Sequence, residues 1–146
     1  MTEGKTKFLL VDGHSIIHAW PDLRILHHRA SKRYLAREEL LKRMRLLQDV
    51  SGERIVVVFD GHGDSTSQQN EQQGIQIFYA GGNLSADGVI ERLVARYASQ
   101  FQVRVCTADG MIWQTVHSLN GGWLSPDDLA FELQRAEKEL GRRLKG

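Results

Sequence analysis

The chain has 146 residues, of which 41% are hydrophobic and 25% are charged, and its formal net charge is +1. This is the composition of a globular protein, so we expect one domain over residues 1–146, without a disordered region or a membrane span. The single cysteine, Cys106, excludes an internal disulfide and a multi-cysteine zinc site and fits a reducing compartment, which makes the cytoplasm the expected location.

Short apolar runs predict about five strands in chain order. They are Lys7–Val11, Arg54–Phe59, Ile75–Tyr79, Val103–Cys106 and Gly121–Leu124. Continuous Val and Ile runs, without strict alternation, favour a parallel sheet that is covered on both faces. The polar segment Gly61–Gly74 is expected to be a loop.

The segments between these runs carry helical periodicity. We predict helices over Arg37–Gln48, Ser85–Gln100, Asp109–His117 and Leu129–Leu144. Ser85 is a candidate N-cap, and the run from Ser125 to Asp128 combines a Ser cap, a Pro and two acids at the start of the last helix. The alternation of strands and helices predicts a three-layer α/β fold with a mainly parallel central sheet.

The small net charge hides a segregation of charge along the chain. Eight basic residues lie between Arg24 and Arg45, whereas Ile55–Glu91 contains no Lys or Arg. The basic residues are Arg24, Arg29, Lys32, Arg33, Arg37, Lys42, Arg43 and Arg45. Basic side chains attract a phosphate backbone, and carboxylates bind the cations that assist its hydrolysis. Each charged run could also be an ordinary solvated face.

Four aspartates lie at the ends of predicted elements. Asp12 and Asp60 follow the first two strands, Asp109 lies just beyond the fourth, and Asp87 falls in the first turn of a helix. In open α/β sheets the carboxyl ends of the strands meet at one rim, where functional groups collect. Clustered carboxylates repel one another unless a cation holds them, and an all-oxygen set suits Mg²⁺ or Mn²⁺. The alternative is that these aspartates only form turns and caps.

Four motifs stand out, in this order: Leu9-Leu10-Val11-Asp12-Gly13-His14-Ser15-Ile16-Ile17, Val56-Val57-Val58-Phe59-Asp60-Gly61-His62, Ser85-Ala86-Asp87 and Thr107-Ala108-Asp109. In these motifs the chain resembles the YacP-like NYN domain family of the wider PIN-like nuclease group, and the resemblance covers about residues 7–140. It implies a PIN-like fold, divalent metal ions and cleavage of single-stranded RNA. By match to the family's acidic positions, the metal-site and catalytic carboxylates would be Asp12, Asp60, Asp87 and Asp109.

One feature departs from this family pattern, and one run of residues is similar to another class of protein. The family opening Asp-Gly-Tyr-Asn has His14 and Ser15 in its last two places here. The run Val58–Gly63 is also similar to a metal-binding motif of metal-dependent serine/threonine phosphatases, which need a longer β-sandwich chain.

The sequence therefore predicts a metal-dependent endoribonuclease that acts on single-stranded RNA, with Mg²⁺ or Mn²⁺ as cofactor. We expect RNA contacts from Ser15, Arg24, Arg29, Lys32 and Arg33. Messenger RNA, presented by an assembly such as the ribosome, is one candidate substrate that nothing in the sequence tests. The alternatives are a non-catalytic RNA-binding or adaptor module with the same fold and, less favoured, a protein phosphatase.

Overall fold

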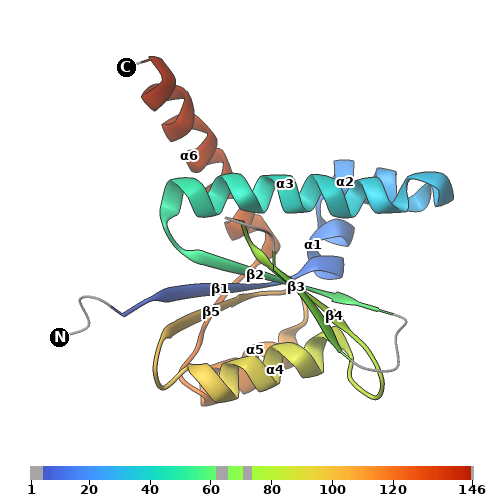
Figure 1. The fold of residues 1–146 in the computed structure, drawn as a ribbon, viewed down its shortest axis with the longest axis vertical. Helices are drawn as coiled ribbons and strands as arrows, with labels where there is room; N and C mark the ends of the chain where they lie inside the picture. Colours follow the sequence, from blue (N-terminus) through green and yellow to red (C-terminus); the bar gives the residue numbers. More distant parts are fainter. Residues whose placement is uncertain (1–4, 62–65, 71–73, 146) are drawn as a thin grey trace.

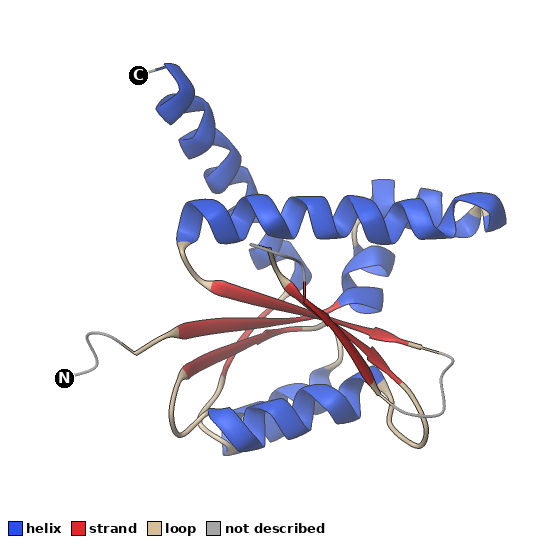
Figure 2. Cartoon of the chain, viewed as in Figure 1, coloured by secondary structure: helices blue, strands red, loops and turns tan. Residues whose placement is uncertain are grey.

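The structure is a computed structural model that describes residues 5–61, 66–70 and 74–145. Within these residues six strands form one sheet (Figures 1 and 2). They are β1 (Lys7–Asp12), β2 (Arg54–Asp60), β3 (Ser67–Asn70), β4 (Gln76–Ala80), β5 (Gln102–Cys106) and β6 (Gly122–Leu124). Their spatial order is β3-β4-β2-β1-β5-β6, and every pairing is parallel except that of β3 with β4.

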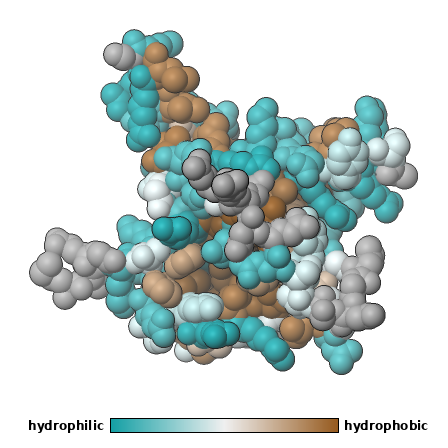
Figure 3. Space-filling model, viewed as in Figure 1, coloured by the Kyte–Doolittle hydropathy of each residue, from teal (hydrophilic) through white to brown (hydrophobic). Residues whose placement is uncertain are grey.

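Helices cover both faces of the sheet, which confirms the predicted three-layer α/β class. They are α1 (Gly13–Ala19), α2 (Pro21–His28), the 3-10 helix η1 (Ala30–Lys32), α3 (Arg33–Ser51), α4 (Ala86–Tyr97), α5 (Gly110–Ser118) and α6 (Pro126–Lys145). Helices α1, α2 and α3 lie on one side of the sheet, and α4 and α5 lie on the other (Figure 1). The end of α6 extends away from the sheet, with brown apolar side chains along it (Figure 3).

The central strands are apolar on both faces because each face has its own core. In β1, Leu9 and Val11 belong to the core under α1, α3 and α6, whereas Leu10 belongs to the core under α4 and α5. In β2, Val57 and Val58 divide in the same way. The alternating side chains of a strand point to opposite faces, so a doubly covered sheet requires the continuous Val and Leu runs that predicted it.

Four elements of the structure, β3, α1, α2 and η1, are additional to those that the sequence predicts. Part of the expected loop Gly61–Gly74 forms strand β3, whose residues Ser67–Asn70 pair antiparallel with β4, whereas residues 62–65 and 71–73 lie outside the described residues. The pairing depends on backbone hydrogen bonds to a neighbouring strand, which a polar sequence does not announce.

The basic segment Arg24–Arg33, which lies outside the predicted helices, is largely helical. Pro21 and Asp22 occupy the first turn of α2, where the fixed φ of proline and a negative charge both favour a helix start. Arg43 of α3 pairs with Asp22, which holds α2 against α3. The expected helix Arg37–Gln48 also begins earlier, at Arg33.

The N-terminal caps of α4 and α6 are confirmed. Ser85 Oγ accepts the Gly88 N–H at 3.2 Å. Ser125 Oγ accepts the Asp128 N–H at 3.0 Å, and Asp128 Oδ2 accepts the Ser125 N–H at 3.3 Å. Each cap satisfies backbone N–H groups that a helix end leaves without a partner.

Candidate metal and nucleic-acid site

All four predicted aspartates line one open pocket of about 490 Å³ at the carboxyl edge of the parallel strands. Asp12 ends β1, Asp60 ends β2, Asp109 follows β5, and Asp87 lies in the first turn of α4. Parallel strands bring their carboxyl ends to the same edge, so four segments far apart in sequence deliver their acids to one place. The pocket is also lined by His14, Ser15, His18, Ala19, Ser85, Ala86 and Ala108.

Asp12 is the most buried of the four and has several partners. Its side chain is only 7% exposed. Oδ1 accepts the Ser15 N–H at 3.4 Å and so caps α1, while Oδ2 accepts the Thr107 hydroxyl at 3.2 Å. Burial raises the pKa of Asp12, and the hydrogen bonds from Ser15 and Thr107 partly offset the effect. Asp12 is therefore fixed in position.

Thr107 connects Asp12 to the loop that carries Asp109. Its hydroxyl oxygen also accepts the Asp109 N–H at 3.1 Å, and Asp109 Oδ1 caps α5 by accepting the Met111 N–H at 2.9 Å. Thr107 belongs to one of the sequence motifs but is not among the predicted site residues. Its signal was a hydroxyl directly after a buried strand and two positions before an acid.

Ser15 stands where the family has Asn and is held by the same loop. Its Oγ accepts the Ala108 N–H at 3.0 Å and lies 3.4 Å from the Thr107 hydroxyl. Ser15 thus ties α1 to the segment between β5 and α5. It also lines the pocket, so its hydroxyl is within the region that a ligand in the pocket would occupy.

Asp60 holds the start of α4 and contacts a histidine. Its Oδ1 accepts the Ala86 N–H at 2.8 Å. His14 Nδ1 lies 3.4 Å from the Asp60 N–H and 3.6 Å from Asp60 Oδ2. Because burial lowers the pKa of His14, its neutral Nδ1 accepts from the backbone N–H instead of forming an ion pair.

Asp87 shows most clearly that the pocket concentrates negative charge. Burial raises its pKa from the usual 3.8 to about 6, and the negative charges of Asp12, Asp109 and Asp60 add to the effect. A hydrogen bond to Asp109 also favours the protonated form of Asp87. A bound cation would relieve this repulsion.

The donor chemistry of the pocket suits a hard divalent cation. Four carboxylates and two hydroxyls provide oxygen ligands, which Mg²⁺ and Mn²⁺ prefer, and His14 and His18 add imidazoles to the same lining. With the side chains as they stand, no three His, Cys, Asp or Glu residues in the described part of the chain come close enough together to form a metal-binding group. Mg²⁺ commonly keeps several waters and takes one or two protein carboxylates, so a shared pocket is compatible with it.

A row of histidines leads from the pocket to the basic segment. The His14 and His27 rings are 6.2 Å apart, His18 and His27 are 4.9 Å apart, and His27 and His28 are 6.2 Å apart. His27 and His28 end α2, so the basic residues that follow them begin beside the pocket. Arg24, Arg29, Lys32 and Arg33 are all exposed.

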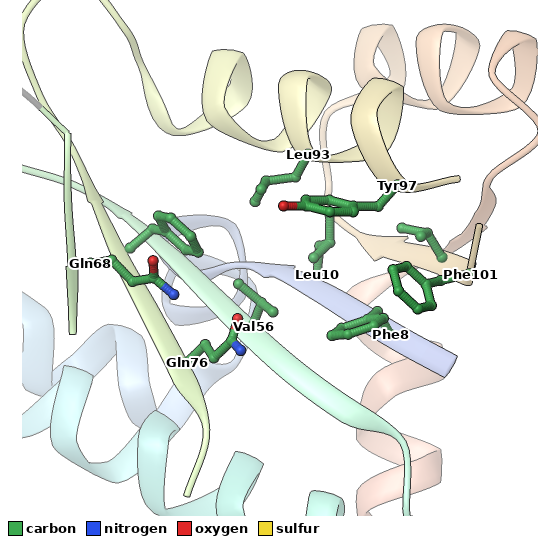
Figure 4. A pocket seen from close by; sticks show the side chains of 10 residues that line it. Phe8, Leu10, Val56, Gln68, Gln76, Leu93, Tyr97 and Phe101 are labelled. Carbon is green, nitrogen blue, oxygen red and sulfur yellow. The ribbon is translucent and has the colours of Figure 1, made fainter. Parts of the chain in front are cut away.

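A second cavity, of about 350 Å³, lies among residues at the other ends of the strands (Figure 4). Its walls include Phe8, Val56 and Val103 from the strands and Leu93 and Tyr97 from α4. Among the described residues that line it, Tyr97 is the only titratable side chain, and none is a carboxylate or an imidazole. It lacks the groups that hydrolysis of a phosphodiester needs, so the acidic pocket is the better candidate.

The parallel sheet also separates this protein from the phosphatase alternative, because those enzymes require a β-sandwich. His62 and Gly63 of the shared run lie outside the described residues. Among the described helices, none is long and apolar enough to cross a membrane.

Comparison with known proteins agrees with the fold and the motifs. A family model described as the YacP-like NYN domain matches residues 9–146. The protein YacP of Bacillus subtilis (strain 168), described as uncharacterized, is 30% identical over 141 residues, which cover 94% of this chain and 81% of YacP.

Two crystal structures of Rae1 (YacP) from the same organism are similar in three dimensions. A Trp-to-Leu mutant of Rae1 matches with a TM-score of 0.80 and 28% identity over 95% of this chain and 81% of its own. Rae1 without that mutation matches with a TM-score of 0.78 and 28% identity over 96% and 80%. The matching fold, the acidic motifs and the family model together show that the chain belongs to the YacP-like NYN domain family.

Proposed function

We propose that this protein is a metal-dependent endoribonuclease that cleaves single-stranded RNA. The observation that carries the proposal is the acidic pocket: four separated segments bring their aspartates to it, and mutual repulsion helps to raise the pKa of Asp87 to about 6. Strongly perturbed carboxylates in a cleft are typical of functional sites. Membership of a family whose members are generally nucleases supports the same chemistry.

Asp12, Asp60, Asp87 and Asp109 are the residues that would hold Mg²⁺ or Mn²⁺. When bound, such a cation activates water and neutralises the charge that develops on the phosphodiester. The chain itself orients the carboxylates: Thr107 fixes Asp12, and the Ala86 N–H fixes Asp60. Positions fixed before the substrate binds lower the barrier to reaction.

The basic segment would bind the RNA backbone beside this pocket. Arg24, Arg29, Lys32 and Arg33 are exposed and lie on or next to α2, whose last residues contact the pocket histidines. Exposed cations bind phosphates without regard to base sequence. Ser15, which lines the pocket, would donate its hydroxyl proton to a phosphate oxygen.

The decisive experiment measures cleavage of an unstructured RNA by purified protein with Mn²⁺. We expect internal cleavage by the wild type, complete loss of it in EDTA, and a loss of at least about 100-fold in Asp12→Asn and Asp87→Asn. Asn retains the shape of Asp and can cap a helix, so these variants remove charge rather than structure. Asp49→Asn, on the exposed side of α3, is the matched control and should cleave normally.

Equal residual cleavage by the wild type and both pocket variants would overturn the enzyme proposal. Salt-dependent RNA binding without cleavage would then indicate a non-catalytic RNA-binding module. The exposed basic residues of Arg24–Arg33, which bind phosphates without a metal, are the observation that favours this second candidate. Turnover of a phosphopeptide without RNA cleavage would indicate a phosphatase instead.

A further inference from the structure

Helix α5 carries an exposed aromatic stack that the fold does not require. Trp113 is 43% exposed, and its ring lies 5.6 Å from that of His117 with an interplanar angle of 15°. The buried residues of α5 are Ile112 and Val116, which anchor the helix to the core of Val89, Val94 and Val105. A large indole that contributes little to a core is available for contact with another molecule.

This stack is continuous with the acidic pocket. Asp109, which lines the pocket, is the N-cap of α5, and Trp113 and His117 follow it at intervals of four residues. Residues four apart lie on the same face of a helix, and four residues advance about 6 Å along its axis. The stack therefore begins about one helical turn from the pocket.

A second partly exposed tryptophan lies close to α5, in the neighbouring strand β6. Trp123 of β6 is 40% exposed, and its Nε1–H donates to the Thr107 carbonyl oxygen at 3.1 Å. Trp123 pairs with Val105, which faces the core under α4 and α5, and directly paired residues share a face. Both partly exposed tryptophans thus belong to the layer of α5, whereas Trp20 is buried and bonded to the Pro126 carbonyl oxygen.

The two sides of the pocket differ in chemistry. The basic segment of α2 and η1 lies on one side of the sheet, and α5 lies on the other (Figure 1). Residues 107–118, which span α5, contain no Lys or Arg, so this side presents rings instead of cations. Unpaired bases stack on aromatic side chains, whereas phosphates bind cations.

We propose that Trp113, supported by His117, is a subsite that stacks on an unpaired RNA base adjacent to the acidic pocket. This inference takes its ligand, single-stranded RNA, from the proposed function. The strand would cross the pocket with its phosphates toward α2 and a base toward α5. The exposed face of the stack would restrict the site to unpaired nucleotides, because a base inside a duplex has both faces covered by its neighbours.

The test is a binding titration that does not depend on cleavage. An unstructured ten-nucleotide RNA is titrated in EDTA against the Asp87→Asn protein, and against the same protein carrying Trp113→Ala, Trp113→Phe or Met111→Ala. A matched strand with abasic sites at alternate positions is the second probe. Met111 is 81% exposed and lies two positions from Trp113, on another side of α5, so it controls for loss of exposed apolar surface.

We expect Trp113→Ala to weaken binding of the ordinary RNA by about 5- to 150-fold and to leave binding of the abasic strand nearly unchanged. Trp113→Phe should restore most of the affinity, and Met111→Ala should have no effect. RNA should also quench tryptophan fluorescence less in Trp113→Phe than in the parent.

Unchanged affinity in Trp113→Ala, or an equal loss for both strands, would overturn the base-stacking inference. The result is separable from the nuclease proposal, which wild-type cleavage tests. If the wild type does not cleave but Trp113→Ala selectively loses the ordinary RNA, the stacking subsite stands and the enzyme proposal falls. If the wild type cleaves RNA but Trp113→Ala binds it normally, the enzyme proposal stands and the stacking subsite falls. The exposed face of α5 would then be a candidate surface for a protein partner.

Discussion

Asp87→Asn is expected to stabilise the protein at pH 8 in the absence of divalent metal. The pKa of Asp87 is raised from 3.8 to about 6, chiefly by burial and then by its acidic neighbours. One pKa unit corresponds to about 1.4 kcal/mol, so the full shift would be worth about 3 kcal/mol. Solvent screening of this half-buried side chain reduces the figure to about 1–2 kcal/mol.

The pH dependence follows from the sign of the shift. A raised pKa means that the folded protein holds the Asp87 proton more tightly than the unfolded chain. The stabilising contribution of that proton is therefore complete below about pH 4 and is lost as the pH rises to about 6. Asp87→Asn has no proton to lose, so its advantage over the wild type should grow across this interval and level off above it.

Thermal unfolding monitored by circular dichroism measures this difference. At pH 8 in EDTA, the Tm of Asp87→Asn should exceed that of the wild type by about 3–8 °C, and at pH 4 the two should nearly coincide. At pH 8, Mn²⁺ should raise the Tm of the wild type more than that of Asp87→Asn, because a cation relieves the repulsion only where all four carboxylates are charged. The exposed control Asp49→Asn should change stability by less than about 0.5 kcal/mol. An Asp87→Asn protein no more stable than the wild type at pH 8, or equally stabilised at pH 4, would refute the charge-repulsion argument.

Three further outcomes test other parts of the structure. Replacing the basic residues Arg29, Lys32 and Arg33 with Ala should weaken RNA binding. It should also reduce the slope of log affinity against log salt by up to about 2 units, which is about 0.7 per phosphate contact. An unchanged slope in a salt titration would mean that these three residues do not contact the RNA backbone. Thr107→Val should lower the free energy of unfolding by about 1–3 kcal/mol in a urea titration, because Asp12 and the Asp109 N–H lose a buried partner, and a neutral result would mean that water replaces the hydroxyl. Arg104 binds Glu53 and Glu132 at 2.6–2.9 Å and so joins β5 to α6. Arg104→Ala should therefore lower the free energy of unfolding by a similar amount, and Arg96→Ala, at an exposed position of α4, is its control.

The sequence was sufficient for the parts of the fold that hydrophobic periodicity controls. The runs of β1, β2 and β5 are apolar because two cores meet them, and the caps at Ser85 and Ser125 are local signals. Strand β3 was missed because its polar residues are held by pairing with β4 rather than by burial of a hydrophobic face. Helix α2 was missed for a different reason: its start signal at Pro21 is present, but only Leu23 of its eight residues is buried, so the apolar periodicity is weak.

For the site, the sequence predicted the acids but not their partners. The positions of Asp12, Asp60 and Asp109 follow from where strands end, and a parallel sheet brings such ends together. The bond between Thr107 and Asp12 joins residues 95 positions apart, and the contact between His14 and His27 depends on how α1 packs against α2. Contacts of this kind depend on tertiary geometry, which local patterns do not encode.

The aspartates hold helix starts and at the same time line one acidic pocket. Asp12 and Asp109 each cap a helix with Oδ1, and Asp60 uses Oδ1 to hold the first N–H of α4. Each carboxylate is thereby fixed through Oδ1, and in Asp12 the second oxygen also accepts the Thr107 hydroxyl. A cap residue is well suited to this double use because the helix that it starts determines its orientation before any cation or substrate arrives. It follows that Ala substitutions would confound loss of a cap with loss of charge, whereas Asn substitutions retain the capping oxygen and isolate the charge on which the proposed chemistry depends.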